Sequence, residues 1–117
     1  MIKTLPLVQP SELPGVSIHY LPDHAGALEK ALVSAGPGIV IPLHVHEVDA
    51  HMYIAAGSGR VLSANEDNGR EVKLGDCVFF ASGLAHGFEA GPGGLTFLSF
   101  NGGILQPDGG LDLAFVA

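Results

Sequence analysis

Short apolar runs, interrupted every few residues by glycine, proline, asparagine or aspartate, limit this chain to a narrow range of folds. The breaks at 36–38, 57–59, 65–69 and 91–94 contain residues that tolerate positive φ or preset a turn. The chain contains 17 glycines and 8 prolines, and both residue types interrupt helices. The pattern therefore predicts an all-β fold of short antiparallel strands and disfavours a helical bundle.

The predicted strands cover 16–20, 28–35, 39–44, 51–56, 60–64, 70–74, 77–80, 86–89, 95–101 and 111–116. The break at 57–59 is expected to be a hairpin turn, and a weak helical turn is expected at 23–30. Closing such strands into a barrel would remove the edges that apolar strands otherwise expose. A single domain spanning 1–117 is expected, because two domains would each lie near the lower size limit for an independent core.

The charge balance excludes several kinds of partner. Five basic residues against 12 acidic ones give a net charge of −7, so neither nucleic acid nor an anionic membrane surface is expected to bind. The only cysteine, Cys77, cannot form an intramolecular disulfide, and it is expected to be buried in an apolar strand. The first residues lack the apolar stretch of a signal peptide. These features together predict a cytoplasmic protein.

Three of the six histidines fall within one short stretch of the chain. His44 and His46 are one residue apart, so in a strand both imidazoles point to the same face. Val40 and Pro42 share that face, which is predicted to look into the barrel. After a tight turn, His51 opens a strand that can lie antiparallel beside the first. Because neutral imidazole binds Zn, Cu, Fe and Ni well, this grouping favours a metal site over a set of buried structural histidines.

Two stretches of the chain carry a recognisable order of residues. Residues 38–57 contain Gly, five residues, His-x-His, four residues, His51 and then Gly57. This resembles the first cupin motif, in which Glu follows His-x-His after three or four residues and Gly follows about six residues later. Residues 75–90 resemble the second cupin motif, although Ala81 replaces its Pro and Ala90 its Asn. The resemblance implies a cupin barrel of the jelly-roll type.

By this resemblance, the metal ligands are His44, His46, His51 and His86. His51 stands where the first motif usually has Glu, and the gap from His51 to Gly57 is one residue shorter than usual. The ion would be one divalent transition metal, namely Mn, Fe, Ni, Co or Zn. Four neutral imidazoles would leave it a formal charge of about +2, which attracts an anionic oxygen more strongly than the charge of about +1 left by three His and one Glu.

Tyr53 shares a strand face with His51 and is expected to point inward, either as an acid or base or as a core aromatic.

The first functional hypothesis is a small metalloenzyme of the isomerase or lyase type, acting on an oxygen-rich metabolite such as a sugar acid, keto-acid or hydroxy-acid. The alternatives are an Fe(II)-dependent dioxygenase and a non-catalytic small-molecule-binding or sensor module. A homodimer is expected, because 47% of this small chain is hydrophobic and cupins often pair.

Overall fold

The computed structural model describes residues 7–21, 30–46, 48–100 and 114–116, and the structural statements below concern these residues. They form strands and no helix, which confirms the predicted all-β fold. In this part of the chain no helix is long and apolar enough to cross a membrane. The strands are β1 (Leu7–Val8), β2 (Val16–Tyr20), β3 (Lys30–Ala35), β4 (Val40–Val45), β5 (Ala50–Ser63), β6 (Glu71–Lys73), β7 (Cys77–Phe80), β8 (His86–Phe100) and β9 (Ala114–Phe115).

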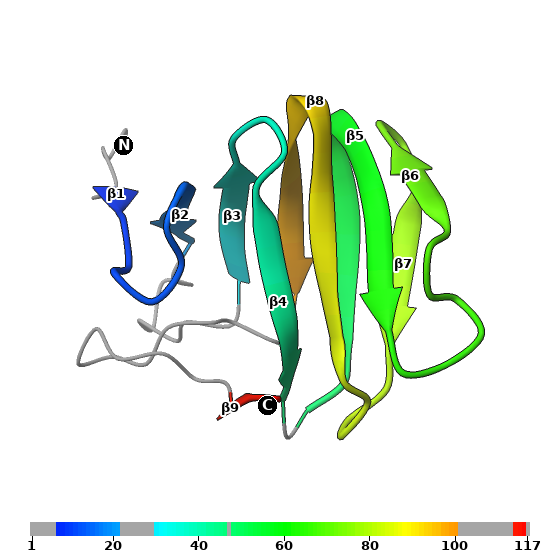
Figure 1. Cartoon of the computed structure of the whole chain (residues 1–117). Coiled ribbons are helices and arrows are strands. Elements are labelled where there is room, and N and C mark those ends of the chain that lie inside the picture. The colour runs from blue at the N-terminus through cyan, green and yellow to red at the C-terminus, as the bar shows by residue number, and fades with distance from the viewer. Residues whose placement is uncertain (1–6, 22–29, 47, 101–113, 117) are drawn as a thin grey trace.

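Two long strands hold the fold together, as Figure 1 shows. β5 and β8 pair antiparallel from His51 opposite Phe100 to Ser63 opposite His86. One half of this pair is extended by β3, β2 and β1 on one side and by β7 on the other. The other half is extended by β4 and β9 on one side and by β6 on the other. The result is a single antiparallel sheet curled into two facing layers, with both long strands running through both layers.

The hairpin turn expected at 57–59 does not exist, and neither does the break at 91–94, because β5 and β8 continue through them. Gly57 and Gly94 both adopt positive φ, at 76° and 83°. A Cβ atom on Gly57 would overlap the carbonyl oxygen of Gly94, so the two backbones approach as only glycine allows. Between the pairs Gly57–Leu95 and Gly59–Ala90, one residue of β5 lies opposite four of β8. This bulge bends both strands from one layer into the other.

The space between the layers is filled by aliphatic and aromatic side chains. A row of buried rings runs through it, from Phe97 to Phe88 at 4.9 Å and from Phe88 to Phe80 at 5.8 Å between centroids. Phe80 then stacks on His86, so the apolar core continues directly into the histidine cluster. The helical turn predicted at 23–30 lies outside the described residues, except for Lys30, which begins β3.

Candidate metal centre

A bulge in β4 turns His44, and His46 directly after the strand, into the barrel. Ile41 is buried, whereas Val40 is 46% exposed and Pro42 is also exposed, so the prediction that Val40 and Pro42 share the inward face is wrong. The pairing of β4 with β8 shifts between Ile41 and His44, and this shift reverses the alternation of side chains. As a result His44 and His46 face inward, as predicted, with exposed fractions of 3% and 5%.

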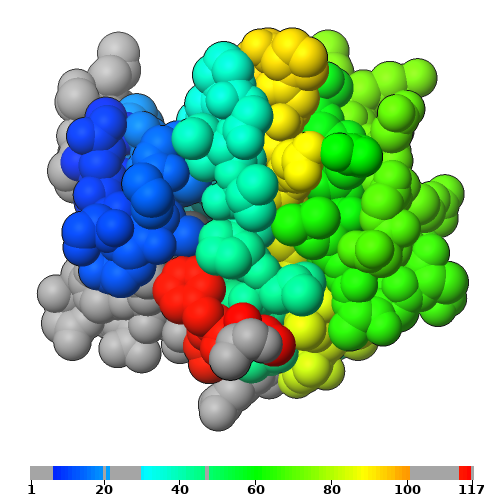
Figure 2. All heavy atoms as spheres, viewed as in Figure 1, coloured from blue at the N-terminus to red at the C-terminus, as the bar shows by residue number. Residues whose placement is uncertain are grey.

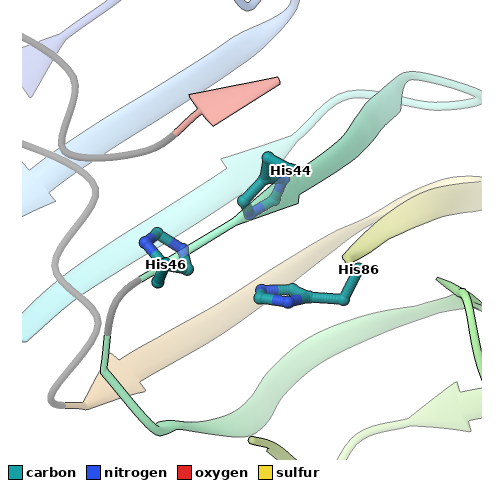
Figure 3. A group of neighbouring side chains, drawn as sticks. All are labelled: His44, His46 and His86. Carbon is teal, nitrogen blue, oxygen red and sulfur yellow. The ribbon is translucent and has the colours of Figure 1, made fainter. Parts of the chain in front are cut away.

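The third histidine comes from the first residue of β8. His86 lies directly opposite His44 in the antiparallel pair and is 1% exposed. Figure 3 shows the three imidazoles turned toward one another, His44 from β4, His46 from the segment directly after it and His86 from β8. Their ring centroids are 4.5 Å apart for His44 and His86, 5.0 Å for His44 and His46, and 5.4 Å for His46 and His86.

Backbone carbonyl groups orient two of the rings. Nδ1–H of His44 donates to the carbonyl oxygen of Pro42 at 2.7 Å, and Nδ1–H of His86 donates to that of Leu84 at 2.9 Å. Since a carbonyl oxygen can only accept, Nδ1 carries the proton and Nε2 of each neutral ring keeps its lone pair. Nε2 of His86 is buried and has no hydrogen-bond partner among the described residues. Leaving such an atom unpaired is unfavourable, so the site suits a group that accepts its lone pair.

The ligand atoms offered by the three histidines all lie within 4.8 Å of one another. Three imidazoles that each present one nitrogen to a common point form a ligand set suited to a divalent transition-metal ion. The carbonyl groups that fix the His44 and His86 rings are the supporting contacts that metal-binding histidines usually have. The three histidines are therefore positioned to bind a metal ion.

Burial keeps the imidazoles of His44 and His86 neutral. It lowers the pKa of His44 to about 4, and the nearby His86 and His46 act in the same direction, against the hydrogen bond to Pro42. Burial also lowers the pKa of His86 to about 4, with His46 contributing in the same direction. Both rings can therefore coordinate a metal at neutral pH without first losing a proton.

Aromatic side chains pack against the histidine cluster. The Phe80 ring stacks on His86 with centroids 4.0 Å apart and an angle of 9° between the planes. On the other side β9 pairs with the end of β4, which places Phe115 opposite His44, with centroids 6.4 Å apart. Figure 2 shows β9 lying against this end of β4. Apolar walls of this kind strengthen the electrostatic interactions of any ion held between them.

The structure does not bring His51 to the other three histidines. His51 and Tyr53 lie on the outer face of β5, where Tyr53 is 41% exposed and the His51 ring lies 5.0 Å from that of Phe79. The buried residues of this part of the strand are Ala50, Met52 and Ile54. The expectation that His51 and Tyr53 point inward is therefore wrong. The physical reason is that β5 begins at Ala50, which takes the inward position and sends the next residue outward.

One residue of the site was missed in the sequence. The first cupin motif allows three or four residues between His-x-His and its Glu, and a gap of three assigns that place to Ala50. The spacing to Gly57 was the available signal, because Ala50 restores the gap of six residues that His51 shortens. Cys77 also differs from expectation, since it is exposed on the outer face rather than buried.

No family model matches the chain, and no curated protein matches it in sequence. Solved structures do match it. The polyketide cyclase RemF from Streptomyces resistomycificus shares 24% identity at a TM-score of 0.69, over 85% of this chain and 78% of that one. A sugar phosphate isomerase of a cupin superfamily, from Silicibacter pomeroyi, shares 26% identity at a TM-score of 0.62, over 73% of this chain and 57% of that one. The chain adopts the cupin fold.

The chain also matches part of a longer protein. A mutant of oxalate decarboxylase from Bacillus subtilis matches at 23% identity and a TM-score of 0.71, over 96% of this chain. The present cupin barrel spans only 30% of that chain. These matches confirm the cupin barrel predicted from the two sequence motifs.

Proposed function

We propose that this cupin binds one divalent transition-metal ion through His44, His46 and His86. The observation that carries the proposal is the convergence of three buried imidazoles whose ligand atoms lie within 4.8 Å of one another. The buried Nε2 of His86, which lacks a hydrogen-bond partner among the described residues, supports it. When bound, such an ion supplies a Lewis acid that polarises an oxygen-containing ligand.

The residues of the chain prepare the site for this chemistry. The carbonyl groups of Pro42 and Leu84 hold two Nδ1–H groups, so the Nε2 atoms of those rings face the centre as lone-pair donors. Phe80 covers one face of the His86 ring and excludes water from it. Tyr53, which the sequence suggested as a proton carrier, faces away from the cluster and forms no part of this proposal.

The substrate class that we propose is an oxygen-rich metabolite such as a sugar acid, keto-acid or hydroxy-acid, converted by an isomerase or lyase reaction. The similar solved structures support this class, because their names refer to a polyketide, a sugar phosphate and oxalate, which are all rich in oxygen. An Fe(II)-dependent dioxygenase is distinguished by its need for O₂. Turnover of such acids under strict anaerobiosis is expected, whereas turnover only in air would favour the dioxygenase.

Metal content tests the core of the proposal. Protein purified without added metal is expected to contain up to one ion per chain, and the metal-free protein should bind Mn(II), Ni(II) or Zn(II) in calorimetric titration. His86→Ala should weaken binding by about ten- to a hundredfold or more, because it removes one of three ligands. His19→Ala, on β2, is the matched control and should bind like the wild type. Unchanged affinity of His86→Ala would contradict the proposal.

We propose a second copy of the chain as a partner. Six adjacent residues of β5, β7 and β8 form what we call the outer apolar face: His51, Tyr53, Cys77, Phe79, Leu98 and Phe100. This set contains no acidic residue, although the chain carries a net charge of −7, so two copies can meet here without charge repulsion.

A cytoplasmic location is proposed because Cys77 is exposed and unpaired, which suits a reducing compartment.

A further inference from the structure

The first inward residue of β5 carries only a methyl group as its side chain. Ala50 is fully buried and is the first inward residue of β5, four positions after His46. It lies opposite Phe80 in the β5–β7 pair, and the Phe80 ring stacks on His86. The next inward residues, Met52 and Ile54, belong to the apolar core and carry no oxygen or nitrogen in their side chains.

We infer that Ala50 leaves this metal centre, within the described part of the chain, with three neutral protein ligands and no carboxylate, so that the bound ligand must supply the negative charge. The inference rests on the proposed function. An ion held by three neutral imidazoles keeps a formal charge of about +2, whereas a protein carboxylate would lower it to about +1. The ligand class that follows is an anionic oxygen compound, namely a carboxylate or an enolate.

Neither His51 nor Asp49 takes the place of the missing carboxylate ligand. His51 is exposed on the outer face of β5 and contacts Phe79, so its imidazole lies on the wrong side of the strand. Asp49 is exposed, and its Oδ1 accepts a hydrogen bond from the backbone N–H of Ser82 at 2.8 Å. Glu47 lies outside the described residues, and it enters the test as a variant of its own.

The first experiment adds the missing carboxylate and compares four full-length proteins: wild type, Ala50→Glu, His51→Ala and Glu47→Gln. Calorimetric titration of each metal-free protein with Mn(II) is followed by titration of the loaded protein with oxalate as the anionic probe. Ala50→Glu is expected to bind Mn(II) at least about tenfold more tightly and oxalate at least about tenfold more weakly, because the centre loses one positive charge. His51→Ala and Glu47→Gln should match the wild type in both titrations.

A second experiment does not require the core to accept a buried carboxylate. Ala50→Cys changes the side chain by one sulfur atom, and a thiolate is a strong metal ligand. Loaded with Co(II), this variant should show a thiolate-to-cobalt charge-transfer absorption. The adjacent His51→Cys, on the outer face, should not show it, and neither should the wild type, whose Cys77 lies on the same outer face.

The outcomes separate the two proposals. A wild-type protein that binds neither Mn(II) nor Co(II) would refute the proposed metal site itself. A wild type that binds metal, together with an Ala50→Cys variant that lacks the absorption, would overturn the inference alone. Weakened Mn(II) binding by His51→Ala or Glu47→Gln would also overturn it, because it would reveal a fourth protein ligand.

Discussion

At the scale of single residues, the same local device orients the His44 and His86 imidazoles. In each case Nδ1–H donates to the carbonyl oxygen of the residue two positions earlier in the sequence, Pro42 or Leu84. This contact decides which nitrogen of each ring is available to a metal, and it needs no other side chain. These hydrogen bonds are local in the sequence. The two rings face each other only because β4 pairs with β8 in the folded chain.

Burial of these rings predicts an acid-labile fold for the metal-free protein. The pKa of His44 and of His86 is lowered to about 4, from the ordinary 6.5, so between these values the unfolded chain binds more protons than the folded one. The free energy of unfolding should be highest above pH 6.5 and should fall as the pH drops from 6.5 to 4. Below pH 4 these two groups should cause no further decrease. The loss amounts to at most about 3 kcal/mol for each imidazole.

Urea unfolding in the presence of a chelator, measured at several pH values, checks this prediction. Because carboxylates also titrate in acid, His44→Gln serves as the comparison, since it removes one of the two imidazoles. Between pH 6.5 and 4, its free energy of unfolding should depend on pH less steeply, because unfolding takes up as much as one proton fewer. Identical slopes for the variant and the wild type would show that His44 does not titrate as proposed.

At the scale of elements, irregular places in the strands position the site. The bulge in β4 turns His44 and His46 inward. The bend in β5 and β8 lets each long strand serve both layers, so that Ala50 and His86 can face the same interior. Bulges and glycine bends of this kind are features of the fold rather than defects, because regular strands would place these side chains on other faces.

Gly57→Ala tests the bend. The variant would hold alanine at a φ of 76° and push its Cβ into the carbonyl oxygen of Gly94, so the strands would have to separate. A loss of about 1–3 kcal/mol or more in unfolding free energy is expected from this strain. Gly93→Ala is the control, because a Cβ there meets no atom within 4 Å. Equal stability of the two variants in urea unfolding would contradict this account of the bend.

At the scale of the whole molecule, metal binding and folding should be coupled. Two of the three ligands lie at the end of β4 and the third lies in β8, far away in the sequence, so their convergence exists only in the folded chain. An ion that binds the folded state alone stabilises it, by about 2.7 kcal/mol at a free concentration one hundred times its Kd. Addition of Zn(II) should therefore raise the melting temperature, and a chelator should reverse the effect. Equal melting temperatures with and without metal would count against the site.

The outer apolar face predicts how two copies of the chain associate. Tyr53 and Phe79 are its exposed aromatic members, and residues of this type often dominate the binding energy of interfaces. Sedimentation at micromolar concentration should show a dimer for the wild type and a monomer for Phe79→Glu, because the variant adds a charge to each half of the interface. Glu66→Gln, outside this face, should remain dimeric. A wild type that sediments as a monomer would refute the dimer.

The all-β class, the cupin motifs and the three histidines that converge could all be predicted from the sequence. Glycine and proline breaks mark short strands through local backbone chemistry, and the spacings around His44, His46 and His86 are matters of sequence distance alone. These features could be predicted because they depend on neighbours along the chain.

Which side chains face inward, and where the strands bend, depends on how distant strands pair and pack. A shift of one residue exchanges the two faces of a strand, so the start of β5 at Ala50 sends His51 and Tyr53 outward. The residues at 57–59 suit a hairpin turn as well as a bend, and only the contact of Gly57 with Gly94 of β8 selects the bend. Both outcomes depend on the register between strands distant in sequence, because hydrogen bonds and packing across the barrel set that register and the local pattern does not.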